Sequence, residues 1–513
     1  MIKAFLGKHL ASRAVKEIQD WSSRPLESQE NWLHKLLSQA KDTTFGKEHD
    51  FGSIKSYEDF KKAVPIREYE DLKPYYDRLK EGEKDLLWPG HPLYFAKTSG
   101  TTQGTAKYIP LTEDSMPNHV ESARQALYCY IHHTGNNDFL NRKMLFISGN
   151  ASLDNLNGIP TGRLSGIVNH HVPWYLKLNQ LPSFETNCID SWEEKLENII
   201  QETEREDLGF LSGIPPWVQM YLEKISEKKQ QKIKDLFQNL SVFVHGGVNF
   251  HPYKEKLINT IGKSIDTVET YPTSEGFIAF QDKHPSEGLL LLTNSGIFFE
   301  FVPLSEFHKD DPPRLSLQDV ETGVNYVVIV NNNAGLWGYN LGDTVRFVST
   351  NPYRLVVTGR VKQFISAFGE HVIVEEIEQA MVEATHQTGV QVKDFTVAPL
   401  IKENQGESHH QWFIEFEKRP ENLNHFRHTL DQNLQKKNLY YKDLVESGIL
   451  EPLHVLVLRP GGFNEYLRSI GQIGMQNKVP RVRNDRQVAE GISDFIERDH
   501  PVNQQFIKEH VRE

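Results

Sequence analysis

Cysteine is nearly absent from this chain, since Cys129 and Cys188 are the only two in 513 residues. Two cysteines are too few for a disulfide framework or for a cysteine-rich metal site. Disulfides are rare in reducing compartments. We therefore expect two reduced thiols in a cytoplasmic protein.

Long apolar runs and an excess of basic residues are missing too. No stretch approaches the roughly 18 consecutive apolar residues of a membrane-spanning helix, so we expect no membrane insertion. The formal net charge of -12 provides no basic field for phosphate backbones and argues against a nucleic-acid partner. A small phosphorylated ligand needs only a local site and is not excluded.

The chain is long enough for more than one domain. Its middle contains apolar, β-branched runs punctuated by Gly, Asn and Pro, at residues 240–247, 288–304, 325–333 and 353–360. Such runs predict β-sheets covered by helices, an α/β class. After Arg360 the composition changes to a small α+β pattern, with helices expected near residue 377 and from Pro420. We therefore predict an N-terminal domain over residues 1–362 and a C-terminal domain over residues 363–513.

A loop rich in glycine and hydroxyl side chains follows a short apolar segment at residues 93–96. Glycines let backbone N–H groups approach an anion, hydroxyls donate further hydrogen bonds and a lysine adds positive charge. The loop is not a Walker A motif, because Ala106 precedes Lys107 and Tyr108 follows it. By composition alone, a flexible linker is the alternative. The residues suited to hold a triphosphate are Thr98, Ser99, Gly100, Thr101, Thr102 and Lys107.

Further segments with chemically suggestive residues follow in the order 245–250, 271–276, 335–347, 358–378 and 471–481. Residues 271–276 offer an aromatic face for a base, a hydroxyl for phosphate and a carboxylate as a hard ligand for Mg²⁺. In the third segment, the carboxylate of Asp343 is suited to accept two hydrogen bonds from a vicinal diol. Taken alone, 271–276 is also compatible with an ordinary strand-to-helix turn, and 471–481 with an exposed basic loop.

Together with the loop at residues 97–110, these segments resemble the signature motifs of the acyl-adenylate-forming superfamily. The longer form of the loop resembles the acyl acid amido synthetases that conjugate auxin or jasmonate to amino acids. The resemblance implies a large adenylate-forming domain joined by a hinge near Lys362 to a small, mobile C-terminal domain. It also implies ATP (AMP) and Mg²⁺ as cofactors, and a small-molecule carboxylic acid and an amine or amino acid as partners.

The resemblance also assigns roles to single residues. Tyr271 would stack on adenine, Thr273 would meet the α-phosphate and Asp343 would bind the ribose. Glu275 would hold Mg²⁺, and Lys478 would bridge carboxylate and phosphate during adenylation, so both are candidate catalytic residues. The full nucleotide-binding set outside the loop would be Gly246, Gly247, Val248, Tyr271, Thr273, Asp343 and Arg360.

The acyl group would meet a helix over residues 212–225, which resembles the family's acyl-lining helix. Its apolar wall would be formed by Ile214, Trp217 and Met220, which are equally compatible with plain helix core. One position departs from the family pattern, because Asn340 stands where arginine is commonest and leaves one charge on the phosphate side unaccounted for.

These features predict an ATP-dependent ligase that converts a carboxylic acid to an acyl-adenylate and then transfers the acyl group to an amine. Two alternatives stay open: an acyl-CoA synthetase that forms a thioester, and a non-catalytic nucleotide-binding relative. The sequence leaves the acid, the amine and the oligomeric state open.

Overall fold

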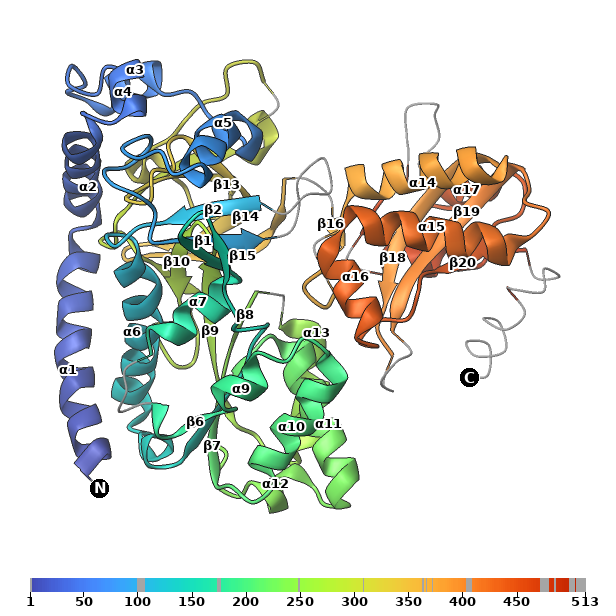
Figure 1. Cartoon of the computed structure of the whole chain (residues 1–513), viewed down its shortest axis with the longest axis horizontal. Helices are drawn as coiled ribbons and strands as arrows, with labels where there is room; N and C mark the ends of the chain where they lie inside the picture. The colour runs from blue at the N-terminus through green and yellow to red at the C-terminus, as the bar shows by residue number, and fades with distance from the viewer. Residues whose placement is uncertain are drawn as a thin grey trace. The chain divides into compact units, whose positions relative to one another are not determined.

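The computed structural model describes residues 2–98, 107–172, 177–247, 250–307, 309–361, 364–365, 367–370, 372–402, 408–470, 479–483, 486–497 and 503. These residues divide into two compact units (Figure 1). The first holds residues 2–98 and 107–361, and the second holds the described residues from 364 onward.

The first unit is built on a mixed sheet that has eleven strands among the described residues. One half is parallel, in the order β9 (Asp266–Thr273), β8 (Val242–Gly246), β7 (Leu208–Gly213), β3 (Lys143–Ile147) and β6 (Gln180–Leu181). The other half is antiparallel and continues from β9 through β10 (Gly276–Phe280), β11 (Leu289–Leu291), β15 (Tyr353–Arg360), β14 (Tyr339–Thr350), β13 (Asn325–Asn332) and β12 (Ile297–Pro303).

A second sheet of this unit has the order β2 (Lys107–Leu111), β1 (Tyr94–Thr98), β5 (Ile159–Gly162) and β4 (Asp154–Leu156). The described helices of the unit are α1 (Ile2–Ser23), α2 (Pro25–Ala40), α3 (Thr44–Glu48), α4 (Tyr57–Ala63), α5 (Tyr69–Lys80), α6 (Met116–Thr134), α7 (Leu164–His170), α9 (Phe184–Asn187), α10 (Trp192–Thr203), α11 (Pro215–Lys229), α12 (Ile233–Leu236) and α13 (His251–Ile261). No helix among the described residues is long and apolar enough to span a membrane.

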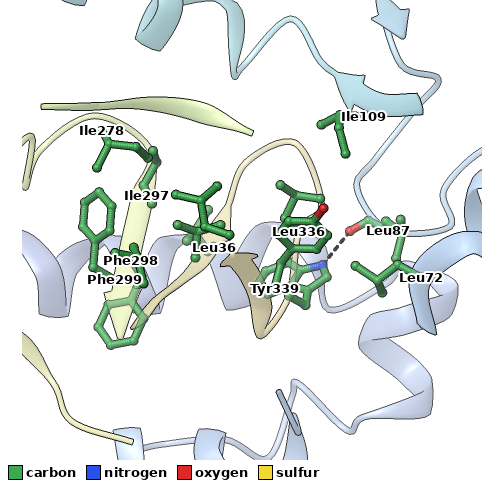
Figure 2. Packing of buried hydrophobic residues seen from close by; sticks show 14 of the residues in the cluster. Leu36, Leu72, Leu87, Ile109, Ile278, Ile297, Phe298, Phe299, Leu336 and Tyr339 are labelled. Atoms are coloured by element: carbon green, nitrogen blue, oxygen red, sulfur yellow. Dashed lines mark hydrogen bonds between the residues drawn. The ribbon is translucent and has the colours of Figure 1, made fainter. Parts of the chain in front are cut away.

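The largest core cluster of this unit joins helices α2 and α5 to the antiparallel half of the sheet. Figure 2 shows Leu36 of α2, Ile278 of β10 and Phe299 of β12 among the side chains of this core. The fully buried indole of Trp337 donates a hydrogen bond to the backbone carbonyl of Leu87 at 3.0 Å. A buried indole N–H needs such a partner, and this bond ties the turn before β14 to the segment after α5.

The second unit packs helices on a three-stranded sheet, β18 (Gln391–Leu400), β19 (His409–Lys418) and β20 (His454–Val457). A short pair, β16 (Phe364–Ile365) and β17 (Val372–Ile373), precedes it. Its described helices are α14 (Val374–Thr388), α15 (Leu423–Lys437), α16 (Leu439–Glu446), α17 (Gly462–Ser469) and α18 (Gln487–Ser493). The predicted fold class, a large α/β part followed by a small α+β part, is confirmed.

Local signals located several elements well. The Ser191 side chain accepts a hydrogen bond from the N–H of Glu194 and begins α10. The helix expected from Pro420 begins later, because the side chain of Asn422 accepts from the N–H of His425 at 3.0 Å and caps α15 there. The apolar run at 288–304 is two strands, since Gly296 adopts φ +88° in the turn between them.

Candidate active site

Three predicted residues from separate strands lie together, because Tyr271 and Arg360 both contact the carboxylate of Asp343. The antiparallel register of β14 and β15 places Asp343 opposite Arg360. Arg360 Nε lies 2.6 Å from Asp343 Oδ1, and the hydroxyl of Tyr271 donates to Asp343 Oδ2 at 2.7 Å. The Asp343 side chain is buried, while that of Arg360 is partly exposed. Each oxygen of Asp343 thus has one partner, and a carboxylate has about four acceptor positions, so capacity remains for a ligand.

Burial and the charge of Asp343 raise the pKa of Tyr271 well above its ordinary range. The phenol therefore keeps its proton and stays a donor to Asp343. Burial lowers the pKa of Arg360, but the charges of Asp343 and Glu275 outweigh burial and the net shift is upward. Arg360 is a fixed positive charge beside both carboxylates.

Glu275 lies in the turn between β9 and β10 and belongs to the same charged group. Burial raises its pKa, while the positive charges of Lys107 and Arg360 act in the opposite direction. The hydroxyl of Tyr339 donates to Glu275 Oε1 at 3.3 Å. The side-chain amide of Asn332 donates to the backbone carbonyl of Glu275 at 2.7 Å, which fixes the turn.

This carboxylate fits a magnesium ion by its chemistry. Mg²⁺ takes oxygen ligands and is usually held by one or two carboxylates together with substrate phosphates. Glu275 supplies such an oxygen next to two cationic side chains that suit phosphate.

The hydroxyl of Tyr76 is fully buried and has no hydrogen-bond partner among the described residues. The negative charge of Glu275 contributes to raising the pKa of Tyr76, so the two groups interact.

The predicted phosphate loop is described only at its ends. Thr98 and Lys107 are paired across the β1–β2 ladder. The Lys107 ammonium lies 5.4 Å from the ring centre of Tyr69, whose hydroxyl accepts the N–H of Tyr108 at 3.0 Å. The other predicted residues of the loop, which are Ser99, Gly100, Thr101 and Thr102, lie outside the described residues.

The two glycine-containing segments are brought together by strand pairing. Gly246 ends β8 opposite Thr270 of β9, and a Cβ at Gly246 would lie 2.4 Å from the Thr270 carbonyl oxygen. Only glycine allows this approach, which sets residues 245–247 beside Tyr271. Gly247 adopts φ +81°, and Val248 lies outside the described residues.

The hydroxyl of Thr273, predicted to meet phosphate, is engaged within its own turn. It donates to the carbonyl of Gly276 at 2.9 Å and accepts the N–H of the same residue at 3.2 Å. These two bonds close the turn that carries Glu275. In this structure Thr273 shapes the site rather than offering its proton to a ligand.

The predicted acyl helix is α11, and its three candidates differ in surroundings. Ile214 caps the helix, and its Cγ2 would lie 3.2 Å from a Cβ at Gly247, so it borders the glycine turn. The ring of Trp217 lies 4.9 Å from that of Trp192 on α10. Met220 is half-buried. Ile214 is therefore the candidate nearest the predicted nucleotide segments, whereas Trp217 packs between two helices.

Lys478 lies outside the described residues, so the structure leaves its predicted role untested. Asn340, the departure from the family pattern, donates to Glu68 Oε1 at 2.7 Å and accepts the N–H of Gly342 at 2.9 Å. Its amide orders the first residues of β14, directly before Asp343. Asparagine is neutral, so this position does not supply the positive charge that an arginine would place there.

Sequence reasoning missed two residues that hold the site in place through hydrogen bonds to other segments of the chain, Asn118 and Tyr339. Asn118 of α6 binds Phe277 through both backbone groups, accepting its N–H at 2.6 Å and donating to its carbonyl at 3.0 Å. Tyr339 lies inside the segment 335–347, directly before Asn340, but the sequence pattern predicts no role for it. Asn118 lies in a stretch without motifs, so no local signal pointed to it.

Comparison with known protein families gives one result along most of the chain. Residues 14–188 match the GH3 family N-terminal domain, residues 290–360 the GH3 family central domain and residues 375–487 the GH3 family C-terminal domain. The matched ranges include Asp343 and Arg360 of the charged group described above.

Curated relatives are distant in sequence. An indole-3-acetic acid-amido synthetase of Arabidopsis thaliana is 22% identical over 562 residues, covering 91% of each chain. A jasmonoyl–L-amino acid synthetase of Nicotiana attenuata is 23% identical over 389 residues, covering 62% of this chain and 66% of that relative. The chain thus spans about two thirds of the length of the second relative.

Solved structures share the fold. An acyl acid amido synthetase in complex with 2,4-DB has a TM-score of 0.61 at 17% identity and covers 95% of this chain and 96% of its own. A 2-hydroxyisobutyryl-CoA ligase in complex with 2-HIB-AMP and CoA has a TM-score of 0.58 at 13% identity, covering 94% and 92%. At these identities the likeness shows the fold alone.

Proposed function

Because the chain belongs to the GH3 family, we propose that it adenylates a carboxylic acid with ATP and transfers the acyl group to the amine of an amino acid. The family resemblance found in the sequence is confirmed, and so is the enzyme class, an acyl acid amido synthetase. The acid and the acceptor of this chain are the open part of the proposal.

The observation that carries the proposal is the convergence of Tyr271, Asp343, Arg360 and Glu275, with Lys107 acting on the last. We assign the nucleoside to Tyr271 and Asp343, the first offering a ring face to adenine and the second accepting the ribose hydroxyls. Lys107 and Arg360 offset the negative charge of the phosphates. Such fixed charges stabilise the crowded anions of the transition state without rearranging during the reaction.

In the first half-reaction an oxygen of the substrate carboxylate attacks the α-phosphorus of ATP, and pyrophosphate leaves. Mg²⁺, when bound through Glu275, would neutralise phosphate charge. Lys478 is assigned to bridge the carboxylate and the α-phosphate. In the second half-reaction an uncharged amine attacks the acyl carbonyl, AMP leaves and an amide forms, so that orientation of the amine is decisive.

We also propose that the first domain holds ATP and the acyl group, while the C-terminal domain supplies Lys478 and moves about a hinge near Lys362. A hinge suits two half-reactions that need different groups over one site. Both cysteines are free thiols, which supports a reducing, cytoplasmic location.

The test is the product formed from ATP, Mg²⁺ and a panel of aromatic, indolic, aliphatic and fatty acids, offered either the twenty amino acids or coenzyme A. Mass spectrometry would detect an N-acyl amino acid if the proposal holds. An acyl-CoA thioester without amide would establish the alternative ligase, whose fold is also close to this one. Neither product from any acid, together with absent ATP binding, would contradict the proposal.

A further inference from the structure

Two histidines and one glutamate gather at one end of the three-stranded sheet, in the second unit. His409 is the first residue of β19 and His454 the first residue of β20. Strands β19 and β20 are labelled in Figure 1. They are parallel, and Gln411 pairs with His454. Since side chains alternate along a strand, His409, Gln411 and His454 share one face.

Glu451 is held at the same end by the backbone. Its N–H donates to the carbonyl of Ser408 at 2.8 Å, directly before β19. Its Oε2 lies 3.2 Å from His454 Nε2 and 4.0 Å from His409 Nδ1. The two imidazole rings are stacked, with centres 3.7 Å apart and planes inclined by 23°. One ligand atom from each of the three residues lies within 4.8 Å of the other two.

The three side chains differ in exposure. His409 is buried, whereas the side chains of Glu451 and His454 are 41% and 39% exposed. The group therefore has a solvent-facing side through which an ion and its waters can enter.

We propose that His409, Glu451 and His454 form a binding site for a divalent transition-metal ion of the zinc type, completed by water. Two imidazoles and one carboxylate are a ligand set found at zinc sites. Mg²⁺ and Ca²⁺ prefer oxygen ligands and bind imidazole poorly. Ligand atoms of a tetrahedral zinc ion lie about 3.4 Å apart. Glu451 and His454 already meet this spacing. An imidazole binds a metal in the plane of its ring, so the two stacked rings cannot both reach one ion as they stand. The partly exposed ring of His454 has to turn out of the stack when the ion binds.

The ion would join the starts of β19 and β20 and would stabilise the C-terminal domain. The proposal rests on residues of the second unit alone and does not depend on the proposed ligase reaction. The positive charges of Arg427 and Lys402 oppose a cation. We therefore expect weaker binding than at a four-ligand structural zinc site.

The test uses the full chain without a histidine tag, dialysed against a chelator. Wild-type protein and the variants His454→Ala, Glu451→Gln and His428→Ala are titrated with Zn²⁺ by calorimetry and with Co²⁺ by visible absorption. His428 is an exposed histidine of α15 in the same unit and serves as the matched control. Circular dichroism and the thermal midpoint without metal verify that each variant is folded.

We expect one Zn²⁺ to bind wild type and His428→Ala equally, with the absorption bands of a four-coordinate Co²⁺ site and a raised thermal midpoint. His454→Ala and Glu451→Gln should bind at least about tenfold more weakly and lose the thermal shift. The proposal is overturned if wild type binds no Zn²⁺, or if the two variants bind it as tightly as wild type. Loss of binding in His428→Ala alone would place the ion elsewhere and overturn it as well.

Discussion

Replacing Asp343 by asparagine should weaken ATP binding through the ribose. In the structure Asp343 already accepts from Tyr271 at 2.7 Å and pairs with Arg360 at 2.6 Å, which leaves acceptor positions for the two ribose hydroxyls. Hydrogen bonds to a charged group contribute about 1.5–3 kcal/mol each. Asparagine keeps one oxygen acceptor but loses the charge, so we expect a loss of about 2–3 kcal/mol, or a rise of roughly 30- to 150-fold in the KM for ATP.

The assay compares ATP with 2′-deoxy-ATP in acid-dependent pyrophosphate exchange. Wild type should prefer ATP, because the deoxynucleotide lacks one of the two donors. In Asp343→Asn the preference should shrink several-fold, whereas a variant damaged only in stability would lose both activities in proportion. A variant that discriminates the two nucleotides as strongly as wild type would refute the assignment of the ribose to Asp343. The thermal midpoint of each protein, measured alongside, shows whether the fold is intact.

Two further changes test the rest of the site, and a third tests a buried lysine outside it. Glu275→Gln should lower adenylation by about 100-fold or more, since the metal supplies several kcal/mol. Because burial raises the pKa of Glu275 above its ordinary value of 4.5, its favourable contribution to stability is present below that pH and is lost as pH rises through the raised pKa. The ligand-free glutamine variant should therefore melt no lower than wild type at pH 7; a lower midpoint would contradict this. Tyr339→Phe removes the hydroxyl 3.3 Å from Glu275 and should raise the Mg²⁺ concentration for half-maximal exchange by about tenfold; an unchanged Mg²⁺ dependence would show that this bond is dispensable. The buried ammonium of Lys195, whose pKa burial lowers to about 8, donates to the backbone carbonyls of Ser148, Gly149 and Asn187. Lys195→Met leaves these carbonyls without a donor and should therefore lower the free energy of unfolding in urea by about 3 kcal/mol or more. A loss below about 1 kcal/mol would contradict this account.

The sequence was most informative where the candidate site residues lie in short contiguous motifs. Tyr271, Asp343 and Arg360 are each predicted from a local motif, and pairing of β14 with β15 brings the last two together. Their roles toward a nucleotide stay predictions. The glycine pattern at Gly246 likewise marked a real close approach, although its physical cause is packing against Thr270.

Supporting contacts could not be predicted because they join distant segments. Asn118 and Phe277 are 159 positions apart, and no periodicity or spacing relates an asparagine of α6 to the backbone of β10. Lys195 gave no signal either, since lysine side chains are ordinarily exposed. Here the side chain is buried and donates to three backbone carbonyls. Thr273 shows a different limit, because its motif was recognised but its hydroxyl is bonded within its own turn.

The central claim is that this charged group adenylates a carboxylic acid, and ATP–pyrophosphate exchange tests it most directly. Purified wild-type protein with Mg²⁺ and a panel of carboxylic acids should incorporate labelled pyrophosphate into ATP only when a suitable acid is present. Glu275→Gln under the same conditions should reduce the exchange by about 100-fold. Exchange that persists unchanged in Glu275→Gln, or wild-type protein that neither binds ATP nor supports exchange with any acid, would contradict the account.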